Sequence, residues 1–253
     1  MSHHLIEVRN LHYTYPDGAE ALRGVTFTIT HGESVGIIGA NGAGKSTFLL
    51  HLAGVLLPSA GSVRIGDCPL SRSTLAEIRR HVGLIFQNPD DQLFMPAVFE
   101  DVVFGPINRG IPRPEAEELA LRALETVGAA HLRDRPPYKL SGGEKRAVSI
   151  ATVLAMTPDI LVMDEPSAGL DPLARRRLLR LLTAFSHTKI IATHDLDLVL
   201  ELCARTIILR DGTVAADGPT SALLRDEALL AASGLEKPLR LQGCPICSSA
   251  ASL

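Results

Sequence analysis

Two stretches near the N-terminus alternate between apolar and polar residues, the first over residues 6–11 and the second over residues 25–29. A period of two is typical of strands that bury one face. The pair Asp17-Gly18 lies between the two stretches, and such a pair commonly forms the turn between neighbouring strands. The pattern therefore predicts two antiparallel strands at the start of the chain.

Later in the chain, short apolar runs predict further strands, and segments with helical spacing of apolar residues lie among them. The runs at 160–163 and 189–193 are typical of strands buried on both faces. The predicted strands are 34–38, 62–65, 82–86, 160–163, 189–193, 206–210 and 213–216. The predicted helices are 45–53, 74–80, 98–105, 115–127, one that opens within 140–146, 173–185, 195–204 and two short ones within 220–233. This mixture predicts an α/β fold.

Residues 87–140 depart from that pattern, because they hold seven prolines and two clear helical segments. A helical lobe of about residues 87–155, inserted into the α/β body, accounts for the change. From Gly234 the periodicity stops. We therefore expect one domain over residues 1–233 and a flexible tail over residues 234–253.

The four cysteines do not form a disulfide framework. Cys244 and Cys247 have the spacing of a metal-binding pair, but a structural zinc site takes four ligands and the sequence has no second such pair. Cys68 and Cys203 stand far apart in the sequence. In a cytosolic protein we expect all four thiols to stay reduced.

Length, charge and composition argue against several classes of protein. A length of 253 residues suits one large domain, or one domain with a lobe. The net charge of −3 gives no electrostatic reason to expect a nucleic acid partner. No apolar run approaches the ~18 residues of a membrane span, and the N-terminus shows no basic region followed by an apolar one, so a cytosolic location is the default.

The nine residues GANGAGKST, 39–47, lie between a predicted strand and a predicted helix. They fit the template of a glycine, four residues, then glycine, lysine and serine or threonine. Glycines let backbone N–H groups approach a phosphate chain, and a helix N-terminus adds a favourable dipole and free donors. We expect Lys45 to bridge the β- and γ-phosphates and Ser46 to ligate Mg²⁺. The predicted nucleotide-binding residues of this loop are Gly39, Asn41, Gly42, Ala43, Gly44, Lys45, Ser46 and Thr47.

Two carboxylates, Asp164 and Glu165, follow the buried strand 160–163. Buried strands of α/β proteins present their chemistry at their carboxyl ends, so we expect both side chains to face the phosphate loop. A solvated acidic turn is the alternative. A second glycine-marked helix start, Ser141-Gly142-Gly143, predicts another anion-binding site.

Two further features each have two interpretations. Tyr15 precedes the phosphate loop at a distance that suits stacking on a nucleotide base, although a strand tyrosine is commonly half-buried packing. The predicted helix 173–185 carries a basic face that is either solvated or a binding patch, and a solvated face is the commoner case. The arginines of that face are Arg175, Arg176, Arg177 and Arg180.

The elements together stand in an order that resembles the nucleotide-binding subunit of ABC transporters, over about residues 5–233. The loop 39–47 matches the Walker A motif, residues 161–165 match the Walker B strand with its trailing glutamate, and residues 140–146 resemble the signature LSGGQ. Gln87 falls at the Q-loop, residues 167–171 resemble the D-loop, and His194 stands at the H-switch. One residue departs from the pattern, because Glu144 replaces the glutamine that closes the usual signature.

This resemblance implies an ABC-type P-loop NTPase core with an antiparallel β subdomain and an inserted helical subdomain. It also implies an ATPase that uses Mg²⁺, with Ser46, Gln87 and Asp164 serving the metal. Glu165 is then the general base, while Gln87 and His194 attend the γ-phosphate. Tyr15 corresponds to the aromatic residue that stacks on adenine.

The family also implies a second subunit. Ser141, Gly142 and Gly143 are expected to complete the nucleotide site of the opposite chain, so that two chains enclose two ATP molecules. Because this chain carries a full set of motifs that includes Glu165, a homodimer with two competent sites is chemically feasible. A heterodimer with a sister ATPase is also open.

Within the lobe, residues 86–94 and 100–106 resemble the ATPase of energy-coupling-factor transporters, particularly the cobalt and nickel type. In that family the region receives a helix of a membrane scaffold subunit. The apolar residues Phe94, Met95, Phe99 and Phe104 either line such a groove or form the core of the lobe. The resemblance thus implies a peripheral subunit on the cytoplasmic face of the membrane, with a scaffold subunit and a substrate-binding membrane subunit as partners and no nucleic acid.

Three alternatives share the nucleotide motifs. The cargo of an energy-coupling-factor importer is also a vitamin in some systems, so cobalt and nickel are favoured by resemblance only. A soluble ABC ATPase, such as a subunit of an iron–sulfur assembly scaffold, lacks the stretches 88–94 and 100–106. A nucleic-acid maintenance ATPase usually inserts a long coiled coil, and residues 87–140 are too short and too rich in proline for one.

Overall fold

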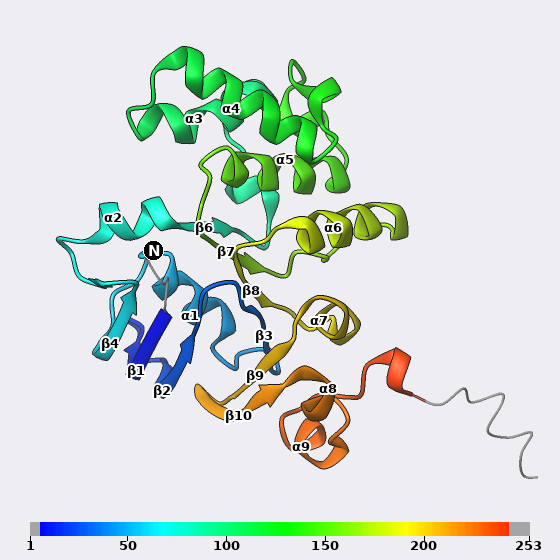
Figure 1. Cartoon of the computed structure of the whole chain (residues 1–253). Coiled ribbons are helices and arrows are strands. Elements are labelled where there is room, and N and C mark those ends of the chain that lie inside the picture. The colour runs from blue at the N-terminus through cyan, green and yellow to red at the C-terminus, as the bar shows by residue number, and fades with distance from the viewer. Residues whose placement is uncertain (1–5, 243–253) are drawn as a thin grey trace, which may run out of the picture.

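The computed structural model describes residues 6–242. It confirms the predicted α/β fold, with an antiparallel β subdomain beside the main sheet and a helical lobe inserted above it (Figure 1). The prediction about Cys244 and Cys247 concerns residues outside the described range. Within residues 6–242, no helix is both long and apolar enough to cross a membrane.

The antiparallel subdomain is a sheet in the order β2 (Glu20–Ile29), β1 (Ile6–Thr14), β4 (Ala60–Ile65) and β5 (Cys68–Pro69). Ile6 pairs with Ile29 and Val8 pairs with Phe27, and all four side chains are buried on one face, as the alternation predicts. The strand β5 was not predicted, because two residues carry no periodic signal.

The main sheet has the order β10 (Thr213–Pro219), β9 (Arg205–Arg210), β3 (Ser34–Ile38), β8 (Thr188–Ala192), β7 (Ile160–Asp164) and β6 (Val82–Ile85). Strands β9, β3, β8, β7 and β6 run parallel to one another, and β10 pairs antiparallel with β9 at the edge. Every residue of β7 and β8 is buried. This agrees with the continuous apolar runs, which are typical of parallel strands covered on both faces.

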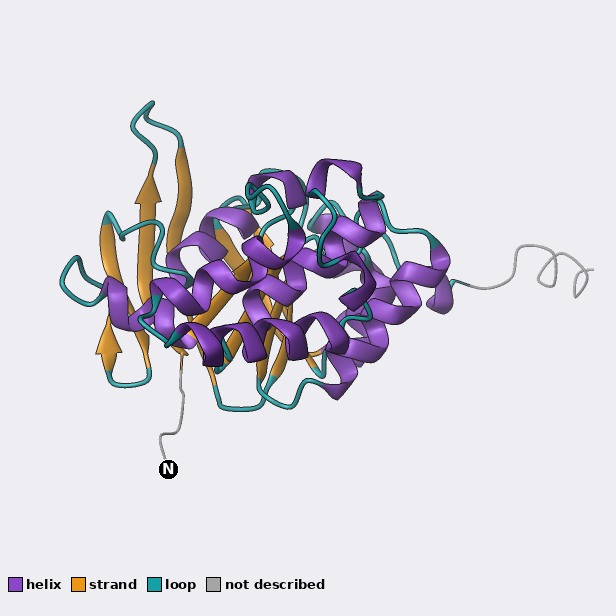
Figure 2. Cartoon of the chain, turned by 90° about the horizontal axis from the view of Figure 1, so that it is seen from above, coloured by secondary structure: helices purple, strands orange, loops and turns teal. Residues whose placement is uncertain are grey.

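The helices divide between the body and the lobe. The body contains α1 (Lys45–Leu52), α2 (Leu75–His81), α6 (Pro172–Ala184), α7 (Leu196–Leu202), α8 (Thr220–Leu223) and α9 (Glu227–Ala232). The lobe contains α3 (Val98–Asn108), α4 (Arg113–Thr126) and α5 (Gly142–Leu154). Short 3₁₀ turns lie at Pro89–Asp91, Ala130–Leu132, Pro137–Lys139 and Leu239–Leu241. Seen from the lobe side in Figure 2, helices lie over the main sheet, and the antiparallel strands stand to one side.

Three apolar clusters hold these layers together. One fills the space between the antiparallel sheet, α1 and one face of the main sheet, and it includes Phe27 and Phe48, whose rings pack edge to face 5.1 Å apart. A second lies on the other face of the main sheet, under α6, α7, α8 and α9. The third is the separate core of the lobe, built from α3, α4 and α5. The lobe therefore has apolar packing of its own.

The described residues 234–242 pack against the body, although the sequence predicts a flexible tail from residue 234. Leu235 and Leu241 pack against the second cluster, and the backbone N–H groups of Leu239 and Arg240 donate to the carboxylate of Asp197 at 3.1 and 3.0 Å. Arg240 also pairs with Glu201 at 2.9 Å. Residues 235–242 are thus fixed to α7, and these apolar positions were missed because the segment has no helical period.

The register of the parallel strands brings several predicted residues to one edge. Ile37 of β3 lies opposite Ala192 of β8, and Asp164 of β7 lies opposite the same Ala192. The loops that follow these strands begin at Gly39, Glu165 and Thr193, so they start side by side. Carboxyl ends of parallel strands are where α/β proteins bind their ligands.

Candidate active site

The loop 39–47 connects β3 to α1 and has the backbone conformation that its glycines permit. The φ angles of Gly39 and Gly44 are +156° and +100°. A Cβ atom on Gly39 would lie 2.2 Å from the carbonyl oxygen of Leu209, and one on Gly44 would lie 2.7 Å from that of Ala21. Neither position accepts a side chain without displacing backbone, so the fold itself requires glycine at both positions.

The start of α1 is left without a protein cap. Gly44 has no side chain to accept from the first turn, and the first turn holds no acidic residue. Free N–H groups and the positive end of the helix dipole make such a terminus a site for an anion. The loop and α1 therefore fit a chain of phosphates.

Lys45 is folded across this loop. Its Nζ donates to the carbonyl oxygens of Gly39 at 2.8 Å and Ala40 at 3.1 Å, and the side chain is buried. Burial lowers the pKa of Lys45, while the charges of Glu165 and Asp164 act to raise it. The ammonium group is thus held by the loop and feels the charges of the two carboxylates, and its contact with the β- and γ-phosphates stays a prediction.

Asp164 ends β7 and is buried. Burial raises the pKa of its carboxyl, and a hydrogen bond with the Ser46 side chain opposes that shift. The residues 6–242 contain no cluster of three or more His, Cys, Asp or Glu side chains that is arranged for a metal ion. A Mg²⁺ site of the nucleotide type needs only one or two protein oxygens beside phosphates and water, so Ser46 and Asp164 fit that kind of site.

Glu165 has a strained backbone, and both oxygens of its carboxylate accept hydrogen bonds. Its φ angle is +46°, an uncommon value for a residue with a side chain, and its N–H donates to the carbonyl oxygen of Ala192 at 2.8 Å. Its Oε2 accepts from the Thr193 hydroxyl at 2.8 Å, and its Oε1 accepts from the His194 N–H at 3.1 Å. Strain of this kind persists where the surroundings fix it, and it gathers at functional sites.

His194 lies against the same carboxylate. Its Nδ1 is 2.8 Å from Glu165 Oε1, and its side chain is 69% exposed, whereas that of Glu165 is 9% exposed. The imidazole therefore covers the solvent side of the buried carboxylate. The structure brings Asp164 and Glu165 to the phosphate loop, as the buried strand predicts, and it places His194 beside them, as the family resemblance implies.

Gln87 follows β6, the neighbour of β7, and its side chain is exposed. Its main-chain carbonyl accepts from Nη2 of Arg146, and the carbonyl of Phe86 accepts from Nη1 of the same arginine. Arg146 belongs to α5 and is only 3% exposed, and burial lowers the pKa of its guanidinium. The segment at Gln87 is thus tied to the lobe helix α5.

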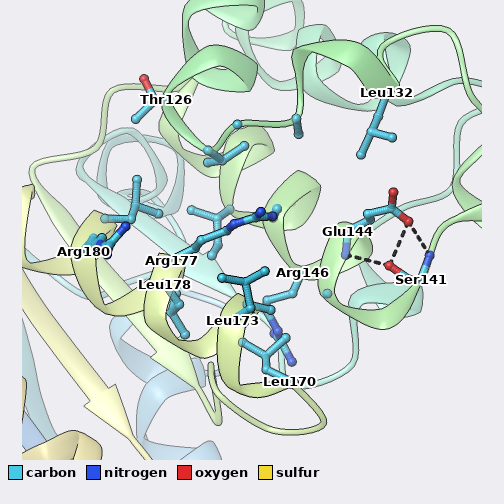
Figure 3. Close-up of a pocket in the computed structure, with 18 of the residues that line it drawn as sticks. Thr126, Leu132, Ser141, Glu144, Arg146, Leu170, Leu173, Arg177, Leu178 and Arg180 are labelled. Atoms are coloured by element: carbon cyan, nitrogen blue, oxygen red, sulfur yellow. Dashed lines mark hydrogen bonds between the residues drawn. The ribbon is translucent and has the colours of Figure 1, made fainter.

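The predicted second anion site lies in the lobe, at the start of α5. Ser141 caps this helix, because its Oγ accepts from the N–H of Glu144 at 3.3 Å. Both the N–H and the hydroxyl of Ser141 donate to Glu144 Oε2 at 2.8 Å (Figure 3). These bonds lower the pKa of Glu144. Glu144 therefore completes a capping box with Ser141, a role that the usual glutamine can also fill.

A cavity of about 570 Å³ separates the lobe from α6 beside this helix start (Figure 3). Its walls include Leu132 of the lobe, Leu173 and Arg177 of α6, and Ser141. On this side the lobe does not pack tightly against the body. Elsewhere α5 packs on the body through Ile150 and Val153, which belong to the second apolar cluster. Gln92 adds a polar link, since it accepts from the Phe86 N–H and donates to Ser149 of α5.

Ser141, Gly142 and Gly143 belong to the lobe, and α5 lies apart from α1 in Figure 1. The single chain therefore presents the two anion sites separately. That they serve one nucleotide between two chains stays a prediction.

Tyr15 lies next to the phosphate loop. Its hydroxyl is 2.9 Å from Thr47 Oγ1, and its ring meets that of Tyr13 edge to face at 4.9 Å. The side chain is half-buried. Its stacking on adenine stays a prediction that this position supports.

The four arginines of α6 differ in exposure and pairing, which the sequence did not predict. Arg175 donates through Nε and Nη2 to the carboxylate of Asp195 at 3.1 and 3.2 Å. The arginines at 176, 177 and 180 are exposed, which is the solvated face that the sequence favours. Helical spacing alone does not distinguish Arg175, because its partner lies on a different segment. Thr193, which binds Glu165, was also missed, since a threonine before a histidine carries no signal by itself.

The apolar residues of the lobe separate into two groups. Phe94 is 64% exposed and Phe104 is 36% exposed, and their rings meet edge to face at 5.1 Å. Phe99, in contrast, packs against the lobe core and is covered by Arg133. The core interpretation is therefore correct for Phe99 and wrong for Phe94 and Phe104, which form a surface patch.

The buried Asp101 fixes the backbone at Phe94 and Met95. One oxygen of this buried carboxylate accepts from the N–H groups of Phe94 and Met95, both at 3.0 Å. Burial raises the pKa of Asp101, and the two N–H groups oppose the shift. The aromatic pair Phe94 and Phe104 thus sits on a fixed segment, and we call it the aromatic patch.

The sequence is similar to a family model and to named proteins of other organisms. The family model described as ABC transporter matches residues 22–168. A protein of Geobacter sulfurreducens that carries the name of an ABC transporter ATP-binding protein is 64% identical over 247 residues, which cover 98% of this chain and 99% of that protein. An energy-coupling factor transporter ATP-binding protein of Methanothermobacter thermautotrophicus is 46% identical over 239 residues, covering 92% of this chain and 77% of that protein.

Solved structures agree in fold. The structure of cbiO1 from Clostridium perfringens, part of the ABC transporter complex cbiONQ, has a TM-score of 0.81 at 35% identity and covers 99% of this chain and 100% of that chain. A dimeric bacterial ABC transporter cassette has a TM-score of 0.77 at 29% identity and covers 85% of this chain and 98% of that chain. The similarity therefore includes both the body and the lobe.

Proposed function

The chain belongs to the ABC transporter family, and we propose that it is the ATP-binding subunit of an energy-coupling-factor importer for a transition metal ion, with cobalt or nickel favoured. As a member of that family it binds ATP and is an ATPase whose hydrolysis is coupled to transport. The importer class is supported by the name of the Methanothermobacter relative and by the complex to which the cbiO1 structure belongs.

The observation that carries the importer proposal is the aromatic patch. Phe94 and Phe104 are exposed although they lie in a lobe with its own apolar core. Exposed aromatic pairs on an ordered surface mark sites of protein contact. The patch lies in the stretches 86–94 and 100–106 that resemble the importer ATPases, where a helix of a membrane scaffold subunit is received. We assign the patch to that contact, which puts the chain on the cytoplasmic face of the membrane.

In the reaction, the loop 39–47 and Lys45 hold the phosphates of ATP, and Tyr15 stacks on the adenine. Catalysis of phosphoryl transfer consists mainly of positioning and charge neutralisation. The uncapped start of α1 and the ammonium of Lys45 supply both. Ser46, Asp164 and Gln87 are the residues that would hold Mg²⁺, which when bound neutralises phosphate charge.

Glu165 acts as general base on the attacking water. Its carboxylate is fixed by the hydroxyl of Thr193 and by two groups of His194. A general base must lie within hydrogen-bond reach of the proton that it removes, so a carboxylate held from three directions has the required fixed position. His194 in turn contacts the γ-phosphate from the solvent side.

Two chains complete each site. ABC ATPases form dimers, as the cassette structure does. We propose that Ser141, Gly142 and Gly143 of one chain bind the nucleotide held by the loop 39–47 of the other. The N–H groups at the start of α5 are suited to this role because they make an anion site. A homodimer or a heterodimer with a sister ATPase satisfies the geometry.

The test is assembly and uptake. The chain is co-expressed with the candidate scaffold and substrate-binding membrane subunits, extracted in detergent and placed in vesicles that contain ATP. We expect co-purification with the membrane subunits and ATP-dependent accumulation of cobalt or nickel. Accumulation of a vitamin instead would replace the metal cargo, and purification without any membrane protein would refute the transport role.

A further inference from the structure

We propose that Thr193 and Asp195 are positioning residues for Glu165, and that Arg175 and Ser167 hold them from the segment after β7. The inference rests on the role proposed above for Glu165 as general base. It concerns a network of hydrogen bonds that joins the loop after β7 and the first turn of α6 to the loop after β8.

Thr193 determines the direction of one bond to the base. Its side chain is fully buried, and its Oγ1 accepts from the N–H of Asp195 at 3.0 Å. Because an N–H can only donate, the single hydroxyl hydrogen is free to point elsewhere, and Glu165 Oε2 lies 2.8 Å away. The hydroxyl therefore donates to the carboxylate and orients it.

Asp195 donates its N–H to Thr193, and the partners of its carboxylate hold Asp195 in place. Its Oδ2 accepts from Arg175 Nε and Ser167 Oγ, each at 3.1 Å. Its Oδ1 accepts from Arg175 Nη2 at 3.2 Å and from the Leu198 N–H at 2.9 Å. The pKa of Asp195 is lowered, because these donors outweigh the effect of burial, which acts to raise it. A paired, bidentate guanidinium is a strong and directional partner for a carboxylate.

The network closes on itself. Ser167 lies two residues beyond Glu165, and the carboxylate of Asp195 connects back to that segment from the other side. Glu165 has a φ angle of +46°, and such a conformation persists only where neighbours determine it. The ring of bonds therefore holds both the backbone and the carboxylate of the base. A catalytic group must be held within about 0.5 Å of its working position.

Arg175 belongs to this network of hydrogen bonds, and its neighbour Arg176 does not. Arg175 is half-buried and paired with Asp195, and Asp195 raises the pKa of its guanidinium. Arg176 is exposed, and among residues 6–242 no hydrogen bond or ion pair involves it. The two side chains have the same chemistry on the same helix, so Arg176 provides a matched control.

The experiment measures steady-state ATP hydrolysis and ATP binding for four variants of the full chain. Thr193→Val keeps the shape and removes the hydroxyl, so we expect kcat to fall by about 10- to 100-fold, the effect of losing one bond to a charged group, with KM and ATP affinity unchanged. Thr193→Ser restores the hydroxyl and most of the rate. Arg175→Met lowers kcat several-fold, and Arg176→Met leaves it unchanged.

A cycle with Glu165→Gln separates this inference from the assignment of the base. If Thr193 acts through Glu165, Thr193→Val causes no further loss in the Glu165→Gln background. A further loss of the same size, or an unchanged kcat in both Thr193→Val and Arg175→Met while Glu165→Gln is inactive, overturns the positioning role and leaves the base assignment intact. A Glu165→Gln variant with the wild-type rate removes the base assignment itself. Thermal unfolding of each variant distinguishes lost rate from lost fold, and Arg175→Met tests the network at a partly exposed position if Thr193→Val does not fold.

Discussion

The Nδ1 atom of His194 lies 2.8 Å from Oε1 of Glu165, and the backbone N–H of His194 donates to the same oxygen. One residue therefore contacts the buried carboxylate through both its main chain and its side chain. The main-chain bond is independent of the side chain, so a substitution at His194 removes only the imidazole.

His194→Ala is expected to reduce kcat for ATP hydrolysis by about 10- to 100-fold, because it removes one bond to a charged group and opens the carboxylate to solvent. ATP affinity should fall less than kcat, since the loop 39–47 and Lys45, which hold the phosphates, are untouched. Steady-state kinetics and equilibrium binding measure the two effects. The exposed His187 supplies the control, and a His194→Ala variant as active as His187→Ala contradicts the role.

Asp101 should govern the stability of the segment under the aromatic patch. Asp101→Ala leaves the N–H groups of Phe94 and Met95 without their acceptor, so we expect a loss of about 1–3 kcal/mol in the free energy of unfolding. Asp101→Asn keeps an acceptor oxygen and should be far milder. Chemical denaturation at neutral pH measures both, and equal losses in the two variants would show that the acceptor is not the cause.

The same residue predicts a pH dependence. Because burial raises the pKa of Asp101 above its ordinary 3.8 in the folded chain, the folded state holds this proton more tightly than the unfolded state does. The stability contributed by the protonated group is present below pH 3.8 and is lost as the pH rises through the higher folded value. Relative to wild type, Asp101→Asn should therefore become more stable as pH rises. Chemical denaturation of both proteins at several pH values measures the trend, and a difference that does not change with pH would contradict it.

Phe94→Asp and Phe104→Asp are expected to release the chain from its membrane partners and to leave ATP affinity unchanged, because both side chains are exposed and belong to the lobe. Co-purification with the membrane subunits and ATP binding measure the two effects. Val55→Asp, at an exposed apolar position of the body, is the control. Unfolding of either phenylalanine variant would instead indicate that the patch stabilises the lobe.

Glu144→Gln tests the unusual signature. The amide oxygen can still accept from Ser141, so the cap of α5 should survive, and the thermal midpoint should change little. If the signature faces the nucleotide of a second chain, removal of a negative charge should tighten the ATP-dependent dimer by about two- to fivefold, as for a partly solvated charge. Sedimentation with ATP measures this, and weaker association in Glu144→Gln would argue against that orientation.

The strands and the phosphate loop could be predicted because their signals are local. The alternation at residues 6–11, the apolar run before Asp164 and the glycines of the loop 39–47 each reflect a constraint within a few residues. The position of Asp164 and Glu165 at the phosphate loop also followed, since parallel strands bring their carboxyl ends to one edge, whereas the place of His194 came from the resemblance to the family.

Other features depend on contacts between distant segments, which a single sequence does not display. The pairing of Arg175 with Asp195 joins α6 to the loop after β8, and the helical pattern of α6 gives no reason to separate Arg175 from Arg176. Residues 235–242 dock on α7 through Asp197, although they lack any period. Whether Phe94 is exposed depends on which residues fill the lobe core, and these come from three separate helices.

The most direct test of the account is a single-turnover measurement of ATP hydrolysis with Glu165→Gln. A glutamine has nearly the shape of glutamate but cannot take a proton, so we expect ATP to bind with unchanged affinity, hydrolysis to fall by about 10²- to 10⁴-fold, and the ATP-bound dimer to persist. A rate equal to that of the wild-type chain would contradict the assignment of Glu165 as the base and, with it, the mechanism proposed for this site.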